Sequence, residues 1–140
     1  MNYWIFKCDP TKYRLDDRLK DPHPHTTWRV SRYRDEIRTG DIAFIWQTGK
    51  ERGLRAVLRV DADPYEMEEL SHEQRFQAEP DHERCVRVAC TLTHRFPLIP
   101  AASLKSIEAL QNMPVFQGFQ QATNFRLTLD EGNRLMSLIV

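Results

Sequence analysis

The chain has 140 residues, of which 41% are hydrophobic and 29% charged, and its formal net charge is zero. This length and composition predict one globular domain, 1–140, that folds without a disulfide or a metal. Zero net charge argues against strong non-specific DNA binding, and no apolar run approaches the roughly 20 residues of a membrane span. The three cysteines lack CxxC spacing and the N-terminus lacks a signal-peptide pattern, so we expect free thiols and a cytoplasmic location.

The apolar pattern predicts strands separated by short helices and loops. Strands are expected, in chain order, at Asn2–Cys8, Thr26–Val30, Ile42–Trp46, Leu54–Val60 and Arg84–Phe96. Helices are expected at Tyr13–Leu19, Arg32–Ile37, Ala101–Leu110 and Thr128–Val140, with a short helix opening at Ser71 and a Gln-rich loop at Pro114–Asn124. This order predicts an α+β fold with a curled, mostly antiparallel sheet or open β-barrel of about five or six strands, surrounded by short helices.

Several local signals refine these elements. Capping-box spacing occurs at Ser71–Gln74 and again between Thr128 and Glu131. The strand Arg84–Phe96 alternates clearly, which predicts that Arg87 points outward and Cys90 inward, and Pro97 is expected to end it.

Charge is distributed unevenly along the chain. Thr26–Arg59 holds eight Arg and Lys residues against four Asp and Glu, whereas Val60–Glu83 holds one Arg against nine Asp and Glu. We interpret the acidic stretch as a solvated helix and loop. The basic centre favours a local anionic ligand over a long duplex.

No known catalytic or metal-binding motif is present. GxGxxG, Walker, HExxH and GxSxG patterns are missing from the sequence. The residues best suited to zinc are His82, Cys85, Cys90 and His94. On a continuous strand, however, Cys85 and Cys90 point to opposite faces about 16 Å apart. We therefore expect neither a metal nor a cofactor.

The aromatic residues of the basic centre suggest a binding site for a flat ligand. Trp28 and Trp46 would sandwich a nucleobase, since stacking a base on one ring contributes about 1–3 kcal/mol. The alternative is that both indoles are core, and the unbroken apolar strand around Trp46 favours this for Trp46. We take Trp4 as core. Side chains available to read the base are Ser31, Gln47, Thr48 and Asn124, and those available to hold phosphates are Arg29, Arg32 and Lys50.

Three separated segments resemble the EVE domains of the PUA-like superfamily, which also contains the YTH readers of methylated RNA. They are YWIFKCDPTKY at Tyr3–Tyr13, TTWRVSRYRDEIRTGDIAFIWQTG at Thr26–Gly49 and QATNFRLTLDEGNRLMSLI at Gln121–Ile139. The chain departs from the family pattern at Ala122, where glycine is common, and at Leu54-Arg55-Ala56 after the central turn.

The resemblance implies a PUA-like barrel with a pocket for a modified or flipped base. By position, the pocket residues would be Trp28, Val30, Ser31, Trp46, Gln47, Thr48, Thr123 and Asn124. From their charge or aromatic character, we expect the nucleic-acid backbone contacts to come from Arg29, Arg32, Tyr33 and Lys50.

Our hypothesis is a monomeric, non-catalytic reader of a modified base whose partner is DNA or RNA. One alternative is a small PUA-like hydrolase or nuclease that uses a carboxylate or histidine near the same cleft. A second alternative is a protein-interaction module.

Overall fold

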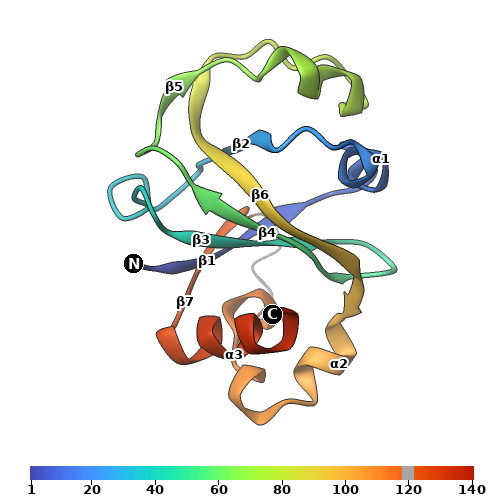
Figure 1. Cartoon of the computed structure of the whole chain (residues 1–140), viewed down its shortest axis with the longest axis vertical. Helices are drawn as coiled ribbons and strands as arrows, with labels where there is room; N and C mark the ends of the chain where they lie inside the picture. Colours follow the sequence, from blue (N-terminus) through green and yellow to red (C-terminus); the bar gives the residue numbers. More distant parts are fainter. Residues whose placement is uncertain (118–121) are drawn as a thin grey trace.

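The structure is a computed structural model that describes residues 1–117 and 122–140. It is an α+β fold built on an open, curled sheet, as expected (Figure 1). The strands are β1 (Tyr3–Cys8), β2 (His25–Arg29), β3 (Ile42–Gln47), β4 (Gly53–Val60), β5 (Tyr65–Met67), β6 (Cys85–Pro100) and β7 (Asn124–Leu127). The helices are α1 (Leu15–Lys20), α2 (Ala101–Lys105) and α3 (Leu129–Ile139), with 3-10 turns η1 (Ser71–Phe76), η2 (Glu108–Leu110) and η3 (Pro114–Phe116).

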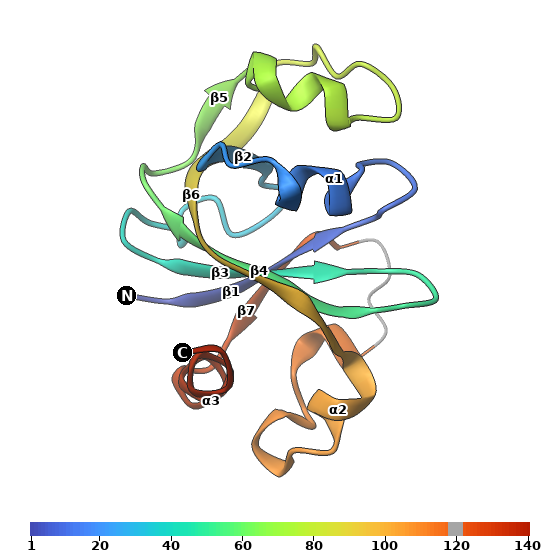
Figure 2. The same ribbon diagram turned by 45° about the vertical axis from the view of Figure 1, so that its right-hand side comes forward.

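The sheet has seven strands within the described ranges, rather than the five or six expected. Its order is β2-β6-β4-β3-β1-β7, with β5 paired to β6. Only the β1–β3 pair is parallel among the strand pairs of the described residues. Figure 2 shows the long β6 running from β5 at one end of the molecule to α2 at the other. The sequence pattern missed β5 and β7, which are only three and four residues long.

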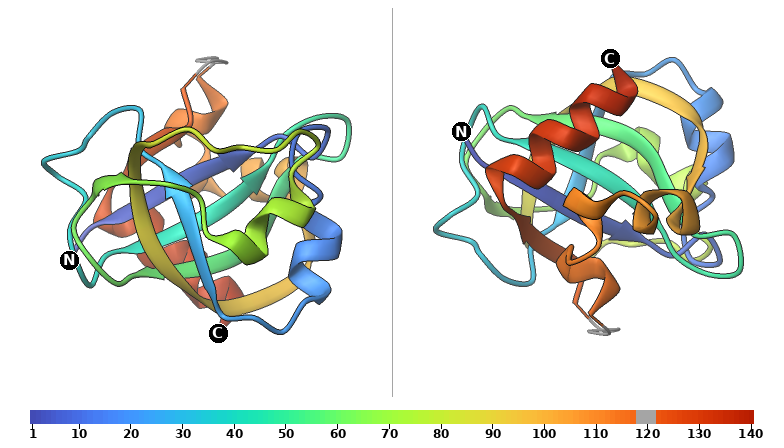
Figure 3. Two further views of the ribbon diagram at one scale, coloured as in Figure 1. Left: turned by 90° about the horizontal axis from the view of Figure 1, so that it is seen from above. Right: turned by 90° about the horizontal axis from the view of Figure 1, so that it is seen from below.

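The central strands bury side chains on both faces, so the domain has two cores. Alternation along β1 sends Tyr3 and Ile5 into one core and Trp4 and Phe6 into the other. Figure 3 shows α2 and α3 lying across one face of the sheet, over the core that contains Tyr3. Helix α1 and the segment after β5 lie over the other face, on the side of the core that contains Trp4. Trp4 is a core residue, as predicted, and its indole N–H donates to buried Asp41 at 2.8 Å.

Two predicted boundaries are wrong because the chain has irregular backbone there. The helix expected at Arg32–Ile37 is a single turn, since Tyr33 has a φ of 65° in the left-handed region. β6 continues through Pro97 to Pro100, and Pro97 lies where the β4–β6 register shifts, between the pairs Leu54–Ile99 and Ala56–Arg95. At such a shift the missing proline N–H removes no ladder hydrogen bond.

Of the predicted helices, the C-terminal one is confirmed together with its capping box. Thr128 and Glu131 form the predicted capping box at the start of α3, with N–H donors 3.1 and 2.9 Å from their acceptors. The capping box predicted at Ser71 is wrong: η1 starts after Leu70 without a side-chain cap. The helix expected at Ala101–Leu110 divides into α2 and η2. Part of the predicted Gln-rich loop, 118–121, lies outside the described residues.

The acidic stretch is largely solvated, as expected, with six of its nine Asp and Glu residues exposed, but part of it is buried. Glu73 is 1% exposed, and its carboxylate lies 2.8 Å from Nε of Arg18. Arg87, expected to point outward, is also 1% exposed and pairs with Asp81 at 3.0 Å. The pair with Arg87 therefore holds the stretch against β6, and the pair with Arg18 holds it against α1. No helix in the described residues has both the length and the apolar character needed to cross a membrane.

Close docking of α3 on β1 gives a first test. A Cβ at Gly132 would lie 2.0 Å from the Tyr3 ring, so Gly132→Ala should lower the free energy of unfolding by about 1–3 kcal/mol. Helix propensity alone predicts the opposite, a gain of about 1 kcal/mol. Urea unfolding, with exposed Ser137→Ala on the same helix as control, distinguishes the two; a stabilised Gly132→Ala would contradict the docking.

Candidate functional site

A cleft of about 710 Å³ opens beside Trp28, a size typical of small-ligand sites. We call it the Trp28 cleft. Segments far apart in the sequence build it: the end of β1 and the following loop, β2, the β3–β4 turn, the acidic stretch, β6 and the residues before β7. Its lining residues are Lys7, Cys8, Asp9, Lys12, Tyr13, Thr27, Trp28, Arg29, Thr48, Gly49, Glu69, Gln77, Asp81, Arg87, Ala122 and Thr123.

Trp28 forms an aromatic wall of this cleft. The indole is half-buried, and its N–H donates to the Lys7 carbonyl at 3.2 Å, which fixes the ring against β1. The Tyr13 ring stands edge-on to it, with centroids 6.0 Å apart, and the Tyr13 hydroxyl donates to the Glu73 carboxylate. A ring held in this way offers a rigid surface for stacking.

A buried carboxylate lies among the polar groups of the cleft. Glu69 accepts hydrogen bonds from the Thr27 hydroxyl and from the Gln77 amide at 3.2 Å, and Arg87 Nη1 lies 3.6 Å away. Burial raises the pKa of Glu69, although the Thr27 hydrogen bond and the Arg87 charge act in the opposite direction. The cleft therefore contains a cluster of hydrogen-bonding groups around Glu69 that is largely shielded from water.

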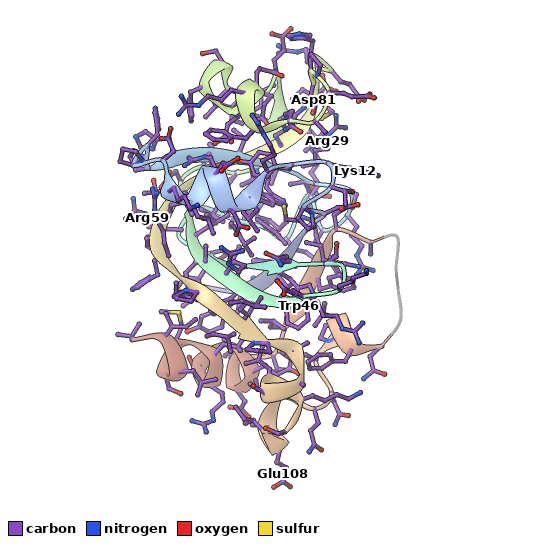
Figure 4. All side chains as sticks on the ribbon, turned by 90° about the vertical axis from the view of Figure 1, so that its right-hand side faces the viewer. Lys12, Arg29, Trp46, Arg59, Asp81 and Glu108 are labelled. Atoms are coloured by element: carbon purple, nitrogen blue, oxygen red, sulfur yellow. The ribbon has the colours of Figure 1, made fainter. Side chains whose placement is uncertain are left out.

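The basic side of the cleft is neutralised by the acidic stretch. Arg29 Nη2 lies 3.0 Å from both carboxylate oxygens of Asp81 and 3.1 Å from Glu83. Figure 4 shows Arg29 and Asp81 close together, on the side of the sheet away from Trp46. Burial alone would raise the pKa of Asp81, but hydrogen bonds from Arg29 and Arg87 outweigh it and hold that pKa below its ordinary value.

The expectation that the two indoles face each other is wrong. Trp46 is 3% exposed and belongs to the core under α2 and α3, whereas Trp28 packs against the other core. Trp46 contacts the Phe116 ring edge-on, with centroids 5.6 Å apart. Because side chains alternate along β3, Trp46 and its neighbour Ile45 enter different cores.

Four of the twelve predicted site residues line the Trp28 cleft: Trp28, Arg29, Thr48 and Thr123. Behind it, Asn124 is fully buried; its side-chain oxygen accepts from the Ser31 N–H at 2.9 Å, and its Nδ2 donates to the Arg29 carbonyl at 3.1 Å. Val30 donates its backbone N–H to Val86 at 3.0 Å. Asn124 thus holds the end of β2 against β7, Val30 holds it against β6, and both support Trp28 rather than line its cleft.

The remaining predicted residues have other surroundings. Gln47 is buried and accepts from Arg55 at 2.6 Å within the β3–β4 region. The Arg32 guanidinium lies 4.9 Å from the Tyr33 ring and 4.9 Å from the Phe125 ring, and its Nε donates to the Asn124 carbonyl. Lys50 lines a second cleft, together with Trp46.

The sequence reasoning missed Tyr13, Glu69, Gln77 and Arg87. Tyr13 lay within a segment that carried the family resemblance, so position in that motif was a usable signal. Arg87 and Glu69 gave none, because each looked like an ordinary exposed charge in its own stretch. Cys8 also lines the cleft, and burial raises the pKa of its thiol to about 12.

Comparison with known proteins decides the family. A family model for the EVE domain matches residues 2–138. The chain belongs to the EVE domain family. Its open, curled sheet is the PUA-like fold expected for such a domain.

Solved structures show the same fold in other proteins. The human THYN1 protein, in complex with 5-methylcytosine-containing DNA, is 20% identical with a TM-score of 0.68, over 99% of this chain and 97% of that one. The DUF55 domain of human thymocyte nuclear protein 1 is 22% identical with a TM-score of 0.68, over 97% of each chain. A hypothetical protein from Leishmania major is 20% identical with a TM-score of 0.69, over 99% and 94%. No curated protein sequence matches the chain.

The buried carboxylate makes stability depend on pH in a defined direction. With the pKa of Glu69 raised, the folded protein binds a proton here that the unfolded chain releases at the same pH. This contribution is present at low pH and is lost as pH rises through the folded pKa. Wild type should therefore gain stability relative to Glu69→Gln as pH falls toward the ordinary glutamate pKa of about 4.3.

Urea unfolding at several pH values measures this gap. Glu68→Gln, an exposed neighbour, is the control for removing one negative charge from the same segment. A gap between wild type and Glu69→Gln that stays constant with pH would contradict the buried environment of the carboxylate.

Proposed function

We propose that this EVE domain binds a modified nucleobase of DNA or RNA in the Trp28 cleft, without catalysing a reaction. The observation that carries the proposal is one half-buried, fixed indole in a cleft of about 710 Å³ that also holds a cluster of buried hydrogen-bonding groups. The human THYN1 protein, which shares the fold, has a structure with 5-methylcytosine-containing DNA. That structure supports a nucleic acid as the partner and 5-methylcytosine as the first base to test.

The cleft residues divide the work of recognition. Trp28 stacks on the base, and stacking on one ring contributes about 1–3 kcal/mol regardless of sequence. A carboxylate such as Glu69 accepts a hydrogen bond from an exocyclic amino group, and the Gln77 amide offers both a donor and an acceptor. A methyl group on the base adds apolar area against the Trp28 and Tyr13 rings.

The mouth of the cleft suits the sugar and phosphate of the bound nucleotide. Lys12 and Arg29 line it and are exposed, and Thr48 and Thr123 bring hydroxyl groups. Because Asp81 and Glu83 already pair with Arg29, this side of the cleft attracts phosphate only weakly. Base stacking, rather than charge, would then dominate binding here.

Binding without catalysis also fits the reactive groups of the cleft. The Cys8 thiol, whose pKa is raised to about 12, is protonated at neutral pH and is a poor nucleophile.

We propose that the protein is located in the cytoplasm. All three of its cysteines are free thiols, which accords with that reducing compartment. We further propose that the protein acts as a monomer.

Nucleoside titration tests the proposal. Trp4 and Trp46 are 0% and 3% exposed, so fluorescence quenching by a stacked base should come from Trp28. Trp28→Ala should weaken binding of 5-methyldeoxycytidine about 10-fold or more, the loss of one stacking contact. Trp46→Phe, a core change, should bind like wild type. Equal binding by Trp28→Ala, or loss of binding in Trp46→Phe alone, would contradict the proposal; circular dichroism confirms that each variant is folded.

A further inference from the structure

A second cleft of about 730 Å³ adjoins the Trp28 cleft. Lys7, Thr48 and Gly49 line both, so they form a ridge between the two. The ridge is held by the chain itself: the Thr48 N–H donates to the Cys8 carbonyl at 2.9 Å, which ties the β3–β4 turn to the end of β1. A ligand seated beside Trp28 therefore has only this ridge to cross to reach the second cleft.

The second cleft is more basic than the first. Lys50, Arg52 and Lys105 line it and are exposed, with Glu51 as the single carboxylate among its described lining residues. The ion pairs found in residues 1–117 and 122–140 do not involve any of these three cations. In the Trp28 cleft, by contrast, carboxylates from Asp9, Glu69 and Asp81 offset the basic side chains. Of the two clefts, the second therefore carries the larger net positive charge.

Its apolar part also suits a nucleic-acid strand. Phe116 is half-buried, and the Lys105 ammonium lies 5.7 Å from its ring centroid. The buried Trp46 ring packs edge-on against the Phe116 ring and supports it on the core side. An aromatic ring beside an exposed cation is a combination that binds a base together with its phosphate in single strands.

We propose that the second cleft binds the nucleotide that flanks the recognised base on the same strand. Lys50, Arg52 and Lys105 hold its phosphates, and the ridge of Lys7, Thr48 and Gly49 separates the two bases. This inference rests on the proposed function of the Trp28 cleft. It assigns the two tasks to different sites: base identity is read beside Trp28, and affinity for the strand comes from the second cleft.

Charge reversal tests this division. In Lys50→Glu/Lys105→Glu, a short single strand with one central 5-methylcytosine should bind about 10- to 100-fold more weakly than to wild type. The slope of log K against log salt should fall by about 1.4, since each phosphate contact in a single strand contributes about 0.7. Binding of free 5-methyldeoxycytidine should be unchanged. Lys20→Glu, an exposed lysine outside both clefts, is the matched control.

The outcomes separate this inference from the proposed function. Unchanged strand affinity and salt slope in the double variant would overturn the inference, as would equal weakening of the free nucleoside. Comparable binding of a poly-glutamate peptide by wild type would show a general anion site and would also overturn it. If modified and unmodified strands bind wild type equally, yet the double variant still loses both, the base-reading proposal fails while the strand-binding cleft stands. Failure of wild type to bind any strand, DNA or RNA, overturns both.

Discussion

Two buried arginines, Arg18 on α1 and Arg87 on β6, hold the acidic stretch in place, and the Trp28 cleft depends on that attachment. Arg18 pairs with Glu73 at 2.8 Å, with both side chains almost fully buried, and Arg87 pairs with Asp81 at 3.0 Å. Removing one partner of such a pair costs about 3–5 kcal/mol, because the other charge is left buried and unpaired. The attachment gives the cleft one wall, brings Glu69 among its lining groups and places carboxylates beside Arg29.

Under the proposed function, this arrangement would let a chain of zero net charge bind a nucleic acid. The acidic stretch offsets the basic side chains around the cleft where a base would stack, so long-range attraction there is weak. In the adjoining cleft, Lys50, Arg52 and Lys105 form no ion pair within residues 1–117 and 122–140 and are exposed. Our two proposals thus place selectivity for a base and attraction for a strand in different clefts, and the zero net charge is expected to keep non-specific binding to duplex DNA low.

Some local signals in the sequence predicted local structure correctly. The capping box of α3, the core position of Trp4 and the α+β class with an open sheet all follow from residue type and spacing, and the structure confirms them. Contacts between distant segments were not predictable in this way. Alternation marks the two faces of a strand but not what covers each face, so Arg87 looked exposed. Likewise, an apolar strand buried on both sides does not reveal which core receives Trp46.

The most direct test of the Trp28 cleft follows the three indole N–H groups in proton–nitrogen correlation spectra while 5-methyldeoxycytidine is added. The Trp28 indole lies at the cleft, whereas the Trp4 indole is bonded to buried Asp41 and Trp46 lies in the opposite core. Our account predicts that the Trp28 signal shifts and saturates while the other two stay in place. A saturating shift at Trp46 with Trp28 unmoved, or no shift at any indole, would contradict it.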